Sequence, residues 1–137
     1  MIDIQQRIDF IKAIDALKEV TRKTYLLSES RFENSAEHSW QVSTLALVLA
    51  DFAPASVDIF KVIKMLLIHD IVEIDAGDVL LYDSARNEEH AKKELEAAHR
   101  LFGMLPDHLR DQLLNLWIEF EAEETCLLYT SPSPRDS

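Results

Sequence analysis

Cysteine, glycine and proline are all scarce in this sequence of 137 residues. The single cysteine, Cys126, excludes an internal disulfide and is typical of a reducing compartment. Two glycines and four prolines leave few breaks in the chain, which favours helices over a β fold with many turns. The length suits one domain with a core of its own, so the sequence predicts one all-α domain.

Long apolar runs and an excess of positive charge are lacking as well. No apolar run approaches the roughly 18–20 residues that cross a bilayer, and the N-terminus is amphipathic and acidic rather than signal-like. A cytoplasmic protein with no membrane partner is therefore expected. The formal net charge of −11 repels phosphate backbones, so no long nucleic acid is expected as a partner. A small phosphorylated ligand is not excluded, because a metal and a few arginines can outweigh the mean field.

Apolar periodicity predicts two helices in the first part of the chain. The first, of about five turns, should bury one stripe. The members of this stripe are Ile4, Ile8, Ile11, Ile14 and Leu17. The second should begin at a cap, Asn34 or Ser35, and end at Pro54. It is apolar nearly all round, with a stripe of Val42, Leu45, Leu49 and Phe52, which predicts a central place in the bundle.

Three further helices are expected in the rest of the chain. The third, from Val57 to Ile68, should turn inward Ile59, Phe60, Val62, Ile63, Leu66 and Leu67. The fourth, from Asn87 to Met104, is charged on most of its surface, so it should lie outside the core helices, with its histidines His90 and His99 on the surface. Its thin buried stripe is Ala91, Leu95, Ala98 and Phe102. The fifth opens at Pro106, buries Leu109, Leu113, Leu116, Trp117 and Phe120, and carries His108 on its surface.

The polar segment between the first two helices, from Val20 to Ser35, allows two interpretations. By composition it is a solvated loop. Alternatively, Arg22 or Arg31 points into a site and clamps an anion.

The densest group of chemically active side chains follows the third helix, in MLLIHDIVEIDAGD from Met65 to Asp78. His69 and Asp70 come directly after an apolar run, and Glu73, Asp75 and Asp78 follow. Buried carboxylates are costly unless they are paired or bind a metal. Two antiparallel helices with a short link would bring the end of the third helix near the start of the second, where His38 lies. The pattern predicts a divalent metal site of His38, His69 and Asp70.

The carboxylates beyond Asp70 fit supporting roles in that site. Glu73 lies one turn further and could hold an attacking water or protonate a leaving group, and Asp78 could do the same. Asp75 has no evident role. Each part alone has a simpler explanation: His38 as a first-turn histidine, His69-Asp70 as a common dipeptide, and the acids as a solvated turn.

Two motifs resemble those of the HD-domain metal-dependent phosphohydrolases, and in particular the branch that includes the 5′-deoxynucleotidases. They are ENSAEHSW, from Glu33 to Trp40, and LLIHDIVEIDAGD, from Leu66 to Asp78. The resemblance covers roughly Met1 to Thr125 and implies an all-α bundle of about five to six helices. It also implies a divalent ion (Mn, Co, Mg, Zn or Fe) held by two histidines and two aspartates, of which His38, His69 and Asp70 match.

The resemblance assigns further roles by position. Glu73 and Asp78 match an acidic pair that supports the water and the leaving group, and Arg22 matches an arginine that contacts the substrate phosphate. The implied reaction is hydrolysis of a phosphate monoester, most plausibly a deoxyribonucleoside 5′-monophosphate. Members of this branch commonly pair as homodimers.

The sequence departs from this family after Thr125. The family's fourth ligand is an aspartate on a later helix, but here the chain continues as CLLYTSPSPRDS, so residues 126–137 are expected to be a disordered or foreign tail. The domain would then be 1–125, incomplete, without its final helices, and with apolar surface exposed on the first three helices. Two other functions therefore stay open: a weak or inactive HD domain that binds nucleotides or partners, and a helical interaction domain whose acids are only surface charge.

Overall fold

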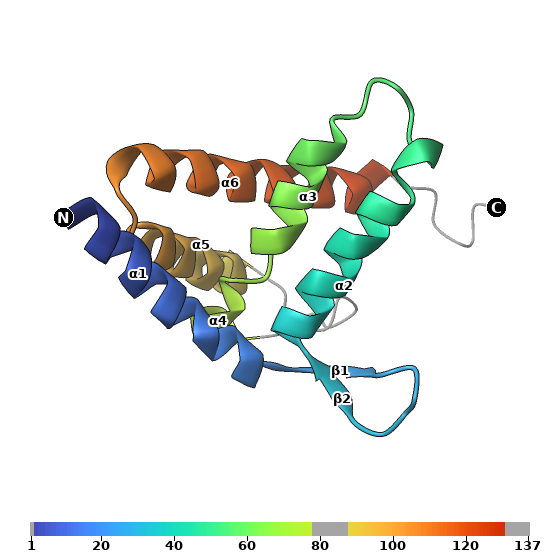
Figure 1. Ribbon diagram of the computed structural model, residues 1–137, viewed down its shortest axis with the longest axis horizontal. Coiled ribbons are helices and arrows are strands. Elements are labelled where there is room, and N and C mark those ends of the chain that lie inside the picture. Colours follow the sequence, from blue (N-terminus) through green and yellow to red (C-terminus); the bar gives the residue numbers. More distant parts are fainter. Residues whose placement is uncertain (1, 78–87, 131–137) are drawn as a thin grey trace.

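The computed structural model describes residues 2–77 and 88–130, and the side chains of 2–77 and 88–123. Its elements are α1 (Ile2–Ile14), η1 (Asp15–Glu19), β1 (Thr21–Tyr25), β2 (Phe32–Asn34), α2 (Ser35–Val48), η2 (Ala50–Phe52), α3 (Ile59–Ile68), α4 (Glu73–Ala76), α5 (Glu88–Phe102) and α6 (Asp107–Thr130), where η marks short 3₁₀ helices. Figure 1 shows α1, α4 and α5 at one end and α2 with the hairpin at the other, while α6 runs along the bundle behind α3. The prediction of an all-α domain is confirmed, with one small two-stranded sheet added.

The hydrophobic core lies where α1, α3, α5 and α6 meet. Its largest fully buried side chain is Phe102 of α5, whose ring stacks on Phe10 of α1 with 6.1 Å between centroids. The buried apolar residues are Phe10, Leu17, Met65, Ile68, Ile71, Val72, Ala97, Ala98, Leu101, Phe102, Leu105, Leu116 and Trp117. Several follow α3 directly, so the segment that carries the candidate ligands is anchored in the core.

The buried face of α1 differs from the predicted isoleucine stripe. Ile4, Ile8 and Ile11 are exposed, whereas Phe10, outside the predicted stripe, is buried; Leu17 is buried as predicted. A helix of this composition has two apolar faces rotated from one another, and periodicity cannot choose between them. Contact between Phe10 and Phe102 decides the choice, because the larger aromatic surface gains more from burial.

The predicted central place of α2 is wrong in the same way. The helix buries Ser35, Ser39 and Ser43, which share one face, and packs that face toward η1 and α3. The predicted stripe lies outward: Leu45 and Leu49 are exposed, and the side chain of Phe52 is 86% exposed. Small serine side chains let the backbone of α2 pack closely against its neighbours. The helix therefore buries its serine face and leaves its more apolar face exposed.

The helix α3 begins two residues later than predicted, after Asp58, whose side chain accepts a hydrogen bond from the Lys61 backbone N–H. It buries Met65 and Ile68. Phe60 and Leu67, expected inside, are exposed. The exposed apolar surface expected on the first three helices is therefore present.

The place predicted for the fourth helix is also wrong. The helix α5 contributes Ala97, Ala98, Leu101 and Phe102 to the centre of the core. His90, expected on the surface, is only 9% exposed and lies 3.9 Å from the Glu94 carboxylate, one turn away. Histidine and glutamate are usually exposed, so the sequence of this helix predicts a surface position even though His90 and Glu94 are buried together.

The two strands were not predicted. The strands β1 and β2 pair antiparallel, with Thr21 opposite Asn34 and Tyr25 opposite Phe32. The side chains of β1 are almost all exposed, so the strand carries no alternation that a pattern could detect. Stacking of Tyr25 on Phe32, with 4.4 Å between ring centroids, closes the hairpin.

The last helix, α6, follows Pro106 as expected and buries Leu116 and Trp117, with Phe120 partly buried. It runs to Thr130, so it extends into the segment expected to be a tail, while 131–137 lie outside the described residues. No helix in 2–77 or 88–130 combines the length and the apolar character needed to cross a membrane.

Candidate metal centre

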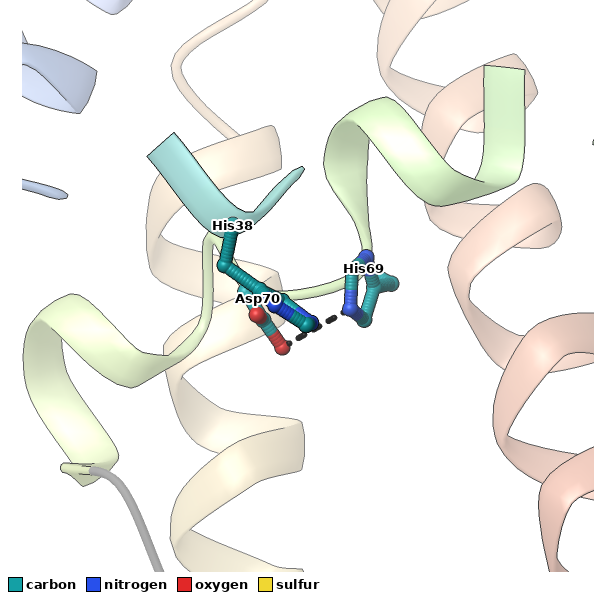
Figure 2. A group of neighbouring side chains, drawn as sticks. All are labelled: His38, His69 and Asp70. Carbon is teal, nitrogen blue, oxygen red and sulfur yellow. Dashed lines mark ion pairs between the residues drawn. The ribbon is translucent and has the colours of Figure 1, made fainter. Parts of the chain in front are cut away.

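Three side chains converge between α2 and α3, and we call His38, His69 and Asp70 the candidate metal centre. Each offers one ligand atom, and these atoms all lie within 4.8 Å of one another. Figure 2 shows the His38 ring, from α2, reaching toward Asp70, with the His69 ring opposite. The structure thus brings together the three ligands that the sequence predicts.

Local sequence fixes the helix end that carries His38. The side chain of Asn34 accepts a hydrogen bond from the Glu37 backbone N–H, and the Glu37 carboxylate accepts one from the Asn34 N–H. This capping box starts α2 at Ser35 and places His38 in its first turn. The other helix end is set by α3, for which His69 is the C-terminal cap residue.

Backbone contacts orient the His69 ring. Its Nδ1 lies 2.6 Å from the Leu66 carbonyl oxygen, which can only accept, so Nδ1 carries a proton. The Phe120 ring of α6 packs against the imidazole, with 5.0 Å between centroids. The second nitrogen, Nε2, lies 3.1 Å from Asp70 Oδ1. With Nδ1 as the donor, Nε2 and the Asp70 oxygen are two electron-pair donors close enough for one cation to bind both.

His38 is held in the same way by a carboxylate. Its Nδ1 lies 3.2 Å from Glu33 Oε1, which leaves Nε2 free to coordinate. Burial lowers the pKa of the His38 imidazole, and the positive charge of Arg22 lowers it further, against the opposing effect of Asp70 and Glu33. The neutral form that metals bind is therefore favoured.

Glu33 is the residue that sequence reasoning missed. It is buried, and besides His38 it contacts the Thr24 hydroxyl at 2.9 Å and Arg22 Nε at 3.4 Å. The feature that could have identified Glu33 is the hairpin. Arg22 and Thr24 are two residues apart on β1, so their side chains lie on the same side of the strand, the side that faces Glu33. Without the strand, nothing in the sequence linked these residues.

Of the two arginines considered as an anion clamp, the structure brings only Arg22 to the centre. Its Nη1 lies 3.2 Å from Asp70 Oδ2 and 3.8 Å from Glu73 Oε1. Arg31 instead pairs with the Glu37 carboxylate at the surface, which holds the pKa of Glu37 at about 2.

The acids beyond Asp70 have different positions. Glu73 is buried, and its carboxylate accepts a hydrogen bond from the Ser35 hydroxyl at 3.1 Å. Asp75 faces away and forms a two-point ion pair with Arg100 of α5, at 2.5 and 2.8 Å. Gly77, with φ of 82°, ends α4 in a backbone conformation that favours glycine. Asp78 lies outside the described residues.

The residues present fit a divalent cation. Two imidazoles with one nitrogen hydrogen-bonded and the other available, together with a carboxylate, are common ligands of first-row divalent metals. Among the described residues, the buried carboxylates of Glu33, Asp70 and Glu73 surround the single guanidinium of Arg22. Such an excess of buried negative charge favours a further cation.

Comparison with known proteins gives consistent matches. Residues 14–126 match the family model described as HD domain. A solved structure of a predicted metal-dependent phosphohydrolase from Magnetospirillum magnetotacticum MS-1 superimposes with a TM-score of 0.83 at 45% sequence identity, over 89% of this chain and 61% of that one.

Curated relatives named 5′-deoxynucleotidase are also similar. The chain is 29% identical to 5′-deoxynucleotidase HDDC2 of Danio rerio, over 86% of this chain and 58% of that protein. It is 32% identical to a 5′-deoxynucleotidase of Erwinia tasmaniensis, over 84% of this chain and 62% of that protein. The chain thus spans about three fifths of the length of these relatives.

Proposed function

Because this chain belongs to the HD-domain family, we propose that it is a metal-dependent phosphohydrolase that cleaves phosphate monoesters. The observation that carries the proposal is the convergence of His38, His69 and Asp70 within 4.8 Å, with Arg22 in contact with Asp70. A cation site beside a partly buried guanidinium suits a substrate phosphate, which both positive charges can bind.

In this proposal His38, His69 and Asp70 hold the metal. A bound divalent ion would lower the pKa of a water and polarise a phosphoryl oxygen. The protein's own contribution is to keep both histidine rings oriented, through the Glu33 carboxylate and the Leu66 carbonyl. The donor set does not choose among Mn, Co, Mg, Zn and Fe.

The remaining residues have roles in hydrolysis itself. Arg22 binds the phosphate of the substrate. Glu73, buried next to Ser35 and Arg22, accepts a proton from the attacking water as its oxygen bonds to phosphorus. The phosphorus–oxygen ester bond breaks, and the leaving alcohol takes up a proton. We assign Asp78 a part in this second transfer on the strength of its place in the motif alone.

For the substrate we propose a deoxyribonucleoside 5′-monophosphate, which gives a nucleoside and phosphate. This choice is supported by the names of the relatives from Danio rerio and Erwinia tasmaniensis.

A phosphate-release assay tests the function. A panel of deoxynucleoside monophosphates is incubated with the protein and Mn²⁺, Co²⁺ or Mg²⁺, and release that depends on metal is expected. His69→Ala should abolish it while the far-ultraviolet circular dichroism stays unchanged. His108→Ala, which removes an exposed histidine far from the centre in sequence, is the matched control and should retain activity. The proposal fails if no metal supports release.

A second candidate function is a weak or inactive HD domain that binds nucleotides or a partner. The observation that favours it is that the described residues place three ligands together rather than four. Metal titration discriminates between the two: micromolar or tighter binding together with turnover contradicts the second candidate. The homodimer and the cytoplasmic location stay predictions that sedimentation and cell fractionation can test.

A further inference from the structure

A cavity of about 540 Å³ opens next to the candidate metal centre. We call it the hairpin cavity. It is lined by Tyr25, Leu26, Leu27, Glu33, His38, Gln41, Val42 and Leu45. Two of these, His38 and Glu33, belong to the metal centre and its support. Whatever occupies the cavity therefore lies against the same imidazole that is proposed to hold the cation.

One wall of the hairpin cavity is a single face of α2. His38, Gln41, Val42 and Leu45 follow the spacing of three and four residues that keeps side chains on one side of a helix. Since His38 is in the first turn, the metal centre lies at one end of this face and Leu45 about two turns away. The face thus leads from the candidate metal centre to a part of the cavity where the described lining side chains carry no charge.

The opposite wall is the end of β1 and the turn that follows. Tyr25 is stacked on Phe32 across the hairpin, and the Leu26 N–H donates to the Arg31 carbonyl at 3.0 Å. These contacts hold the wall in place before any ligand arrives. A preformed pocket loses less conformational entropy on binding.

The chemistry of the hairpin cavity away from the metal end is specific. Its walls are aliphatic and aromatic, and the Gln41 amide offers both a donor and an acceptor. Within residues 2–77 and 88–123 no hydrogen bond to the Gln41 side chain is found, so this amide remains available. The volume lies within the range of about 300–1,000 Å³ that is usual for small-molecule sites.

We propose that the hairpin cavity binds the base of a nucleoside monophosphate, with the base between Tyr25 and the aliphatic side chains of α2 and its polar edge on Gln41. An apolar slot with an aromatic wall suits a planar ring, and an amide is complementary to the donors and acceptors at a base edge. The inference rests on the proposed function for its choice of ligand. It goes further by assigning base contacts to named residues.

The test uses ligands that separate the base from the phosphate. Saturation-transfer NMR is measured on the full chain with deoxyadenosine, which has no phosphate, and with 2-deoxyribose 5-phosphate, which has no base. Transfer to the base protons of deoxyadenosine is expected. Leu45→Ala should raise its Kd at least fivefold, and Gln41→Trp, which fills the cavity from an exposed helix position, should abolish transfer. Binding of 2-deoxyribose 5-phosphate should be unchanged in Leu45→Ala.

Leu47→Ala is the matched control. Leu45 and Leu47 are leucines of the same helix with exposed fractions of 56% and 63%, and only Leu45 lines the hairpin cavity. Equal Kd values for deoxyadenosine in the two alanine variants, or no transfer to base protons in the wild type, would overturn the inference. Since nucleoside binding requires neither metal nor turnover, an inactive chain that still binds deoxyadenosine counts against the proposed function alone. An active chain that does not bind it counts against the cavity alone.

Discussion

At the scale of single residues, hydrogen-bonded neighbours decide which atoms of the two histidines face the candidate metal centre. The Leu66 carbonyl accepts a hydrogen bond from Nδ1 of His69, and the Glu33 carboxylate accepts one from Nδ1 of His38. Each contact selects one tautomer and leaves Nε2 as the nitrogen available to a metal. The geometry of the candidate metal centre therefore depends on Glu33 and Leu66 as well as on its own three residues.

Glu33 gives the clearest prediction at this scale. Glu33→Gln should weaken metal binding about tenfold to a hundredfold, because the neutral amide holds the His38 ring less firmly and makes it less basic. Isothermal calorimetry with Mn²⁺ measures the affinity. Glu19→Gln, at an exposed position outside the centre, should leave it unchanged. Equal affinities in the two variants would contradict a positioning role for Glu33.

Glycine at position 103 is a second residue that the fold constrains. A Cβ added there would overlap with the His99 backbone oxygen. Gly103→Ala should therefore lower the free energy of unfolding by about 1–3 kcal/mol, since the end of α5 must shift. Urea denaturation measures the loss, with the exposed Gln112→Ala as a control. If the variant is as stable as the wild type, the backbone at the end of α5 can move to make room for the methyl group without loss of free energy.

At the scale of elements, Asp75 and Arg100 join α4 to α5. The short helix α4 has only four residues and follows directly after the segment that carries His69 and Asp70. The two-point contact with Arg100 holds it against α5, which is central to the core. This explains the one acid in the motif for which the sequence suggested no role.

Removal of this contact should be measurable. Arg100→Ala is expected to lower the free energy of unfolding by about 0.5–1 kcal/mol, the upper part of the range for partly exposed pairs, because the geometry is bidentate. Arg110→Ala is the matched control, since its partners Asp107 and Asp111 belong to the same helix. Chemical denaturation compares the two variants. If the free energy of unfolding falls equally in both variants, the contact between Asp75 and Arg100 does not stabilise the packing of α4 on α5.

The sequence predicted some elements better than others, for physical reasons. The ligands His38, His69 and Asp70 could be grouped because two antiparallel helices with a short link must meet end to end. The strand β1 could not be predicted, since its exposed side chains show no alternation. Glu33 was missed with it, because its partners Arg22 and Thr24 meet it only through the hairpin.

At the scale of the whole molecule, the choice of buried faces was the hardest feature to predict. The helices α1 and α2 each carry more apolar side chains than one face can hold, and contacts such as Phe10 on Phe102 select what is buried. The apolar side chains left outside include Ile4, Ile11, Trp40, Leu47, Val48 and, just beyond α2, Phe52. Surfaces of this kind promote association with other apolar surfaces.

Phe52 allows this consequence to be tested. Phe52→Ser should reduce binding of the dye ANS and self-association seen by sedimentation velocity, while thermal stability stays within about 0.5 kcal/mol of the wild type. The reason is that 86% of this side chain is exposed, so its removal takes little from the core. Unchanged ANS binding, or a large loss of stability, would contradict the described exposure.

The crossing of α2 and α3 has a further electrostatic consequence. Because His38 lies in the first turn of α2 and His69 caps the end of α3, the N-terminus of one helix adjoins the C-terminus of the other. Aligned peptide dipoles give these ends the equivalent of about half a positive and half a negative charge. The backbone thus makes the two sides of the centre electrically different: positive charge is favoured at the His69 end, and negative charge is favoured at the start of α2, where the Glu73 carboxylate accepts a hydrogen bond from the Ser35 hydroxyl.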